Sequence, residues 1–170
     1  MVSGFNLLAV RADSALPLTE LLRSIERQIA DVPIEIGFCF DSDGGELARR
    51  AGTHNAIAHP PAEALTFADG FYTHNHPAQS FFSLRDLLFA HELNLRQLRA
   101  VAGTVVHILD RPLAGWQPLV CRTAIQEGSS RVRVLFADPQ TTAARKQKLY
   151  ERVVRRIFAQ LHLVVRTEPL

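Results

Sequence analysis

Cysteines and long apolar runs are scarce in this sequence, and each absence excludes a class of protein. Cys39 and Cys121 are the only cysteines, and neither belongs to a Cys-x-x-Cys pair. Both are expected to be small buried thiols rather than halves of a disulfide, which favours a reduced, cytoplasmic setting. No apolar stretch approaches the ~18 residues that a membrane span needs. The first residues lack the basic region and apolar run of a signal peptide. We therefore expect no membrane segment and no secretion signal.

Low-complexity tracts and a strong excess of one charge are also missing. With 47% hydrophobic residues and a formal net charge of +2, the 170 residues fit one folded domain over 1–170. The charge is uneven, since residues 1–127 hold 10 Lys and Arg against 14 Asp and Glu, whereas residues 128–170 hold 9 against 3. A basic segment of this kind is most often the solvated face of a helix. Nucleic acid or an acidic protein is the lesser alternative as its partner.

Apolar periodicity divides the chain into alternating helices and strands. Residues 17–30 place leucine and isoleucine at helical spacing, and residues 141–163 repeat that pattern with arginines on the other face. Between them, short runs rich in Ile, Phe and Val end at Gly, Pro or Asp turns, as strands do. Strands are expected in the hairpin 34–51, at 71–76, at 97–109 as a pair or one bent strand, and around 131–138 after a turn at 128–130; short helices are expected at 61–68 and from Ser83. The pattern predicts the α/β class, with a mixed sheet flanked by helices.

The segment THNHPAQSFFSLRD, residues 73–86, has two histidines one residue apart at a strand end. Residues i and i+2 of a strand point to the same face, so His74 and His76 are expected to aim both imidazoles at one point. Pro77 ends the strand, and the next helix carries Asp86 in its first turn, close to the strand end. Two imidazoles and one carboxylate form the open three-ligand set of a catalytic zinc site. The segment therefore predicts Zn²⁺ bound by His74, His76 and Asp86.

Ser83 and Asp86 have a second interpretation, because Ser-x-x-Asp at a helix start is close to a capping box. In that interpretation Ser83 is the N-cap and Asp86 belongs to the first turn of the helix. The two interpretations are compatible, since the Ser83 side chain can cap the helix in one state and serve the site in another.

The motifs THNHP at 73–77, FSLRD at 82–86 and NLRQLRAV at 94–101 resemble the signature of the JAMM (MPN-type, JAB-domain) zinc metalloprotease family, most closely its prokaryotic and phage-associated branch. This resemblance implies a JAB/MPN-like (cytidine-deaminase-like) fold. It also implies that His74, His76 and Asp86 bind zinc, that Ser83 helps to hold the oxyanion, and that an upstream glutamate is the general acid/base. The implied reaction is hydrolysis of a peptide or isopeptide bond in a protein substrate, which in this family is often ubiquitin-like.

Three glutamates precede the histidines as candidates for the general acid/base. Glu35 is the best placed, since it begins a strand that ends at a glycine turn, as the early glutamate strand of the family does. Glu46 begins the return strand and comes second. Glu63 lies in an expected helix and is interpreted as solvated.

The loop from Pro77 to Ser83 departs from the family pattern in two ways. It is one residue shorter than the usual spacing, and Ala78-Gln79-Ser80 replaces a small, glycine-containing sequence. Asp86 must therefore reach the site by a tighter turn.

The remaining histidines and two other functions complete the sequence-based picture. His59, which precedes two prolines, is expected in a loop near the site, where shaping a substrate groove is the lesser alternative. His91 is expected to be a satisfied core histidine rather than a ligand. One alternative function is a JAMM-like protein-binding module without turnover. The other is a metal-dependent nuclease or phosphoesterase, since His-x-His also occurs in metal phosphoesterases and the C-terminal helix is basic.

Overall fold

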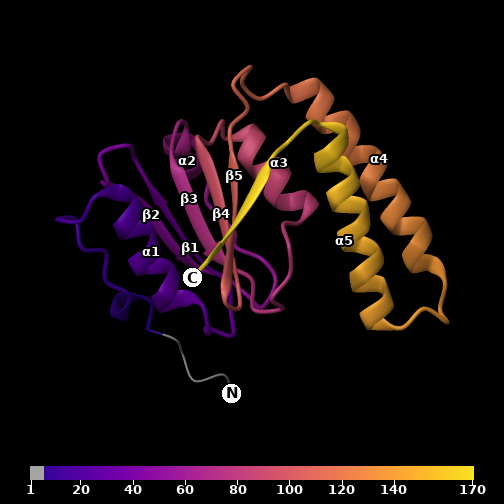
Figure 1. Cartoon of the computed structure of the whole chain (residues 1–170), viewed down its shortest axis with the longest axis horizontal. Helices are drawn as coiled ribbons and strands as arrows, with labels where there is room; N and C mark the ends of the chain where they lie inside the picture. The colour runs from indigo at the N-terminus through magenta and orange to yellow at the C-terminus, as the bar shows by residue number, and fades with distance from the viewer. Residues whose placement is uncertain (1–5) are drawn as a thin grey trace.

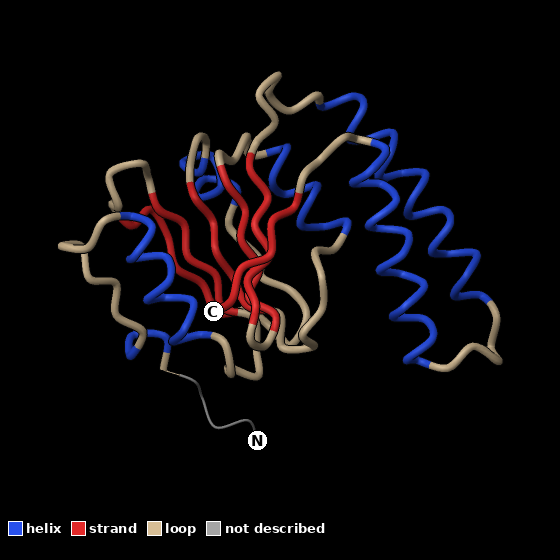
Figure 2. Tube along the Cα trace, in the orientation of Figure 1, coloured by secondary structure: helices blue, strands red, loops and turns tan. Residues whose placement is uncertain are grey.

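The computed structural model describes residues 6–170, and a six-stranded mixed sheet runs through its centre (Figures 1 and 2). The strands β3 and β4 are parallel, and every other neighbouring pair is antiparallel. In spatial order the strands are β2 (Glu46–Ala51), β1 (Ile36–Phe40), β3 (Phe71–Asn75), β4 (Gln97–Ala102), β5 (Val105–Asp110) and β6 (Val165–Pro169). The helices are α1 (Leu18–Ile29), α2 (Pro61–Ala64), α3 (Leu84–Glu92), α4 (Pro118–Ala137) and α5 (Ala143–Gln160), with short 3-10 turns at Leu7–Ala9 and Leu65–Phe67. The predicted mixed sheet flanked by helices is confirmed.

The helices form a layer on each side of the sheet (Figure 1). On one side, α1 packs over alternate strand residues such as Phe38, Val101 and Ile108. On the other side, α3 and the α4–α5 hairpin pack over residues of the opposite strand face, including Leu98 and Leu109. Because successive side chains of a strand point to opposite faces of the sheet, the strands contribute apolar residues to both cores. Within residues 6–170, none of the helices has the length and apolar character to cross a bilayer.

The predicted elements 17–30, 34–51 and 141–163 are confirmed as α1, the β1–β2 hairpin and α5, with slightly shorter bounds. The segment 97–109 is an antiparallel pair, β4 and β5, which was one of the two expected forms. Strand β6 was not predicted. It pairs with β5 at the sheet edge, although residues 165–169 carry three polar side chains and a proline. Its pairing with β5 stabilises this strand, because the β-propensity of its own residues is weak.

The strand expected around 131–138 is wrong, because α4 is continuous from Pro118 to Ala137. Gly128, which was interpreted as part of a turn, is buried where α4 packs against its neighbours. A Cβ at this position would lie 3.2 Å from both Leu84 Cδ1 and Ile157 Cγ1. The glycine therefore permits close helix packing rather than ending an element.

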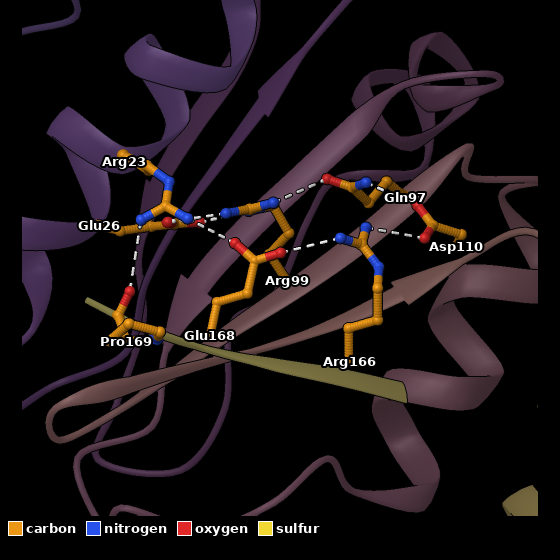
Figure 3. Close-up of polar contacts among 8 residues, drawn as sticks. All are labelled: Arg23, Glu26, Gln97, Arg99, Asp110, Arg166, Glu168 and Pro169. Carbon is orange, nitrogen blue, oxygen red and sulfur yellow. Dashed lines mark hydrogen bonds and ion pairs between the residues drawn. The ribbon is translucent and has the colours of Figure 1, made fainter. Parts of the chain in front are cut away.

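A polar network lies on the face of the sheet beneath α1 (Figure 3). The carboxylate of Glu26 accepts hydrogen bonds from Arg99 at 2.5 and 3.0 Å and from the Thr73 hydroxyl at 3.0 Å. Arg23 on the same helix forms an ion pair with Glu168 of β6 at 2.5 Å. Figure 3 shows how these contacts join α1, the central strands and the edge strand β6.

Candidate metal centre

His74, His76 and Asp86 converge on one point, as the sequence predicted. The two histidine Nε2 atoms lie 2.8 Å apart. The Asp86 Oδ1 atom lies 3.2 Å from Nε2 of His74, and Oδ2 lies 3.4 Å from Nε2 of His76. One ligand atom from each residue falls within 4.8 Å of the others, so this group could bind a metal ion.

His74 lies between small residues of the two neighbouring strands. In the sheet register His74 is paired with Gly37 of β1 and with Ala100 of β4. The N–H group of His76 donates to the carbonyl of Val101 at 2.8 Å, which continues the parallel pairing beyond the end of β3. Both histidines are therefore held by the sheet rather than by a mobile loop.

The short loop after Pro77 forms a tight turn, as expected from its length. The N–H group of Gln79 donates to the His76 carbonyl at 2.8 Å, and Gln79 has a φ of +52°. The next residue, Ser80, places its carbonyl 2.9 Å from Nδ1 of His76. Because a carbonyl only accepts, Nδ1 of His76 carries a proton, and Nε2 is the ring nitrogen that faces the cluster. In the part of the chain that the structure describes, Nδ1 of His74 is buried without such a partner.

Ser83 and Asp86 form the capping box at the start of α3. The Asp86 N–H group donates to the Ser83 hydroxyl at 3.1 Å, and the Ser83 N–H group donates to Asp86 Oδ2 at 2.6 Å. The same carboxylate faces both histidines. The cap therefore fixes the carboxylate that completes the three-residue cluster.

The charges in the cluster are strongly coupled. Burial disfavours the ionised Asp86 carboxylate, but the two histidines outweigh burial and hold its pKa well below the usual range. Burial also lowers the pKa of His76, but the hydrogen bond and charge of Asp86 outweigh it and raise this pKa to about 9. A cation that binds at Nε2 would compete with the His76 proton.

Glu35 lies across the pocket from the histidines. It directly precedes β1, and its backbone exchanges hydrogen bonds with Thr53 at 2.7 Å and with Gly52 at 2.8 Å. The antiparallel β1–β3 register pairs Gly37 with His74, and continuing it by two residues places Glu35 opposite His76. Burial raises the pKa of Glu35, while the charges of the two histidines act against that rise. The side chain lines the same pocket as the metal-binding cluster.

The other two glutamates lie outside this pocket. Glu46 is paired with Phe40 at the far end of β1, is exposed, and forms a 2.5 Å ion pair with Arg49. Glu63 forms 2.7 Å contacts with Arg50 and with His59, so its interpretation as a solvated side chain is wrong. The hydrogen bond from Arg50 is the main cause that lowers the pKa of Glu63 to about 2.

Asn75, the residue between the histidines, has a role that sequence reasoning missed. It points to the other face of the strand, where its Oδ1 accepts the Ile36 N–H group at 2.6 Å. Its Nδ2 group donates to the carbonyls of Val32 at 2.9 Å and Ile34 at 3.0 Å. These three bonds hold the segment that carries Glu35. A polar residue at the inward-facing position of a buried strand was the available signal.

The cluster opens into a pocket of about 430 Å³. His59 lines it, and its Nε2 lies 2.8 Å from the hydroxyl of Tyr72, which also lines the pocket. Gln147 and Tyr150 of α5 form another part of the wall. No sequence pattern predicted this role for Tyr150, because it lies in the apolar stripe of its helix. Burial raises the pKa of Tyr150, against hydrogen bonds with Leu84 and Ser83 that lower it.

His91 lies outside the site, as expected, but it is not a satisfied core histidine. It is buried, and both of its ring nitrogens lack a hydrogen-bond partner among residues 6–170. Burial lowers its pKa, so the neutral form is favoured.

The pocket gathers side chains from segments far apart in the chain: the residue before β1, the end of β3, the first turn of α3, and α5. Cys39 and Cys121 are both free and buried.

Comparisons of the chain with protein-family models, with curated proteins and with solved structures give no match.

Proposed function

We propose that this protein is a zinc-dependent hydrolase of the JAMM type, which cleaves a peptide or isopeptide bond. The observation that carries the proposal is the convergence of His74, His76 and Asp86 in a pocket that also holds Glu35. The order of these groups, with a glutamate before the first hairpin strand, two histidines on the next strand and a carboxylate on the following helix, agrees with the resemblance seen in the sequence. On this basis residues 1–170 form one JAB/MPN-like domain.

The donor set fits zinc better than the other common divalent cations. Imidazole nitrogens suit zinc, whereas magnesium and calcium prefer oxygen ligands throughout. The hydrogen bond from His76 Nδ1 to the Ser80 carbonyl is the outer-shell contact expected of a ligand histidine. Three protein ligands rather than four favour a catalytic site with a position open to water or substrate.

The three proposed zinc ligands, Glu35 and Ser83 each have a role in this reaction. Zinc bound by the three side chains would act as a Lewis acid that brings the pKa of water close to neutral. Glu35 takes a proton from the attacking water and later delivers it to the leaving amine, for which a raised carboxyl pKa is suited. The Ser83 hydroxyl donates to the carbonyl oxygen of the substrate as negative charge develops on it.

The substrate proposed is a protein or peptide, including an isopeptide formed by a ubiquitin-like protein. The pocket is large enough to take the residues on each side of an amide. Two buried free cysteines agree with a reduced, cytoplasmic setting, which is part of the same proposal.

Zinc content and hydrolysis test the proposal together. Purified wild-type protein is expected to hold about one zinc per chain by elemental analysis, and Asp86→Ala is expected to lose it. Glu35→Gln is expected to keep the zinc and to lose hydrolysis by roughly 10²–10⁴-fold. The probes are an internally quenched peptide library and a ubiquitin–lysine isopeptide. Glu46→Gln is the matched control, since the same substitution is made in the same hairpin but outside the pocket.

The outcomes separate the candidate functions. Equal zinc in the wild type and in Asp86→Ala would remove Asp86 as a ligand and contradict the proposal. Zinc binding without hydrolysis of either probe would favour a protein-binding module. Metal-dependent degradation of DNA or RNA would favour the nuclease alternative.

A further inference from the structure

The hydroxyl of Tyr150 reaches the active-site end of α3 from a helix late in the chain. The Leu84 N–H group, in the first turn of α3, donates to the Tyr150 oxygen at 3.0 Å. This N–H group is one of the first-turn donors that a helix cannot satisfy internally. Tyr150 is half-buried and lines the pocket together with His74, His76 and Asp86. Its hydroxyl is therefore held at the start of α3, the helix that carries Asp86.

The hydrogen bonds around Tyr150 and Ser83 leave a proton available to the pocket. The Tyr150 oxygen accepts from Leu84, and the Ser83 oxygen accepts from the Asp86 N–H group at 3.1 Å. A hydroxyl accepts without using its own proton. Both hydroxyls bind N–H groups in the first turn of α3, and neither donates to an acceptor within residues 6–170. If one donates to the other, the second still has a proton to give to a ligand.

We propose that Tyr150 is a second oxyanion donor of the site, acting beside Ser83. This inference rests on the proposed hydrolase function. The Tyr150 O–H group donates a hydrogen bond to the carbonyl oxygen of the substrate amide as that oxygen becomes negative, and no proton is transferred. Because both hydroxyls sit at the start of α3, the partial positive charge of the helix N-terminus supports the same oxygen.

The proposal gives the α4–α5 hairpin a catalytic role. Tyr150 lies 66 residues after Leu84, and Gln147 on the same helix also lines the pocket. The hairpin therefore contributes a reacting-site group as well as a cover for α3.

The test uses a tetrahedral anion that does not depend on knowing the substrate. Full-length protein loaded with Co²⁺ is titrated with inorganic phosphate, and binding is followed through the visible spectrum of the metal. Tyr150→Phe is expected to keep Co²⁺ but to bind phosphate about 10-fold more weakly, as expected for the loss of one donor to a charged group. Thr142→Ala is the matched control, because it also removes a hydroxyl that accepts a helix N-terminal N–H group, but at α5 and outside the pocket.

Hydrolysis supplies the second measurement. With any probe that the wild type cleaves, Tyr150→Phe is expected to lower kcat by about 10²–10³-fold with little change in KM. Thr142→Ala is expected to leave both constants unchanged. An equal effect of the two substitutions would show that only helix capping was lost.

A measurement on the unsubstituted residue covers the case in which Tyr150→Phe does not fold. The chain has two tyrosines, so 3-fluorotyrosine labelling gives two fluorine resonances, which Tyr72→Phe assigns. In the zinc-loaded protein, phosphate is expected to shift the Tyr150 resonance. Wild-type protein that binds no metal would overturn the proposed function and this inference together. Metal and phosphate binding with no response from Tyr150 would overturn this inference alone.

Discussion

His91 is a buried histidine whose polar ring nitrogens are not used in hydrogen bonds with the described residues. Its two ring nitrogens lack partners among the described residues, and the nearest charges are those of Glu92 on α3 and Arg122 on α4. A buried polar group without a hydrogen bond costs free energy, while an apolar residue of similar size there is neutral or stabilising. We infer that the sequence keeps a histidine here at the expense of stability.

Replacement of His91 by leucine is expected to raise the free energy of unfolding by about 1–2 kcal/mol at pH 7. The gain is expected to grow in acid. Burial sets the pKa of folded His91 below its unfolded value, so the unfolded chain binds more protons below about pH 6.5. Wild-type stability is therefore lost as the pH falls through that value, and the variant lacks this loss.

Urea denaturation of wild type and His91→Leu between pH 5 and 8 measures both effects. His162→Asn is the control, because His162 is exposed and has a φ of +53°, which asparagine tolerates. A variant less stable than the wild type at every pH would contradict the prediction.

At the scale of the element, α4 shows how a local sequence pattern misleads. The alternation of arginine and valine at 131–134 has the period of a strand, and the Gly-Ser-Ser sequence before it has the composition of a turn. The segment is nevertheless helical, because α3 and α5 offer it a packing surface that a strand could not use. Gly128 lies in this contact, where a Cβ would be 3.2 Å from both Leu84 and Ile157, so the lack of a side chain allows the helices to pack closely.

Introducing valine at two adjacent positions of α4 tests whether Gly128 is needed for close helix packing. Gly128→Val is expected to lower the free energy of unfolding by about 1–3 kcal/mol, because the new side chain meets Leu84 and Ile157. Ser129→Val introduces the same side chain at an exposed position of the same helix, where serine and valine have similar helix propensities, so a change within about 0.5 kcal/mol is expected. Chemical denaturation measures both, and similar losses at the two positions would argue against close packing at Gly128.

At the scale of the whole molecule, the two sides of the sheet have different chemistry. The side that holds the candidate metal centre is covered by α3, α4 and α5. The side beneath α1 carries the ion-pair network in which Glu26 is fully buried against Arg99 (Figure 3). Through Arg23 and Glu168 the same network fastens β6, which closes one edge of the sheet. The buried ion-pair network and the candidate metal centre thus lie on opposite faces of the sheet.

Loss of the Glu26 carboxylate is expected to be costly for the whole fold. Glu26→Ala leaves the buried Arg99 guanidinium without its partner, so the free energy of unfolding is expected to fall by about 3–5 kcal/mol. Glu20→Ala on the same helix is the control, since Glu20 is exposed and a change within about 0.5 kcal/mol is expected there. Thermal and urea denaturation measure the difference. Equal stability of the two variants would show that the buried pair contributes little.

The sequence by itself determined the local parts of this protein. The spacing of His74 and His76, the capping signal at Ser83 and the helical periodicity of α1 and α5 each act within a few residues, so each could be predicted. The choice of Glu35 over Glu46 was favoured but not decided, because both begin strands of one hairpin and only the pairing of β1 with β3 shows which end meets the histidines.

Only the tertiary structure decided the contacts between distant segments. Three of these contacts join positions far apart in the chain: the hydrogen bonds of Asn75 to residues 32–36, the hydrogen bond between Leu84 and Tyr150, and the pairing of β6 with β5. A propensity or a periodic pattern describes one segment at a time and carries no information about its partner. These contacts exist because helices and strands bury their apolar faces together, and that burial depends on the whole chain.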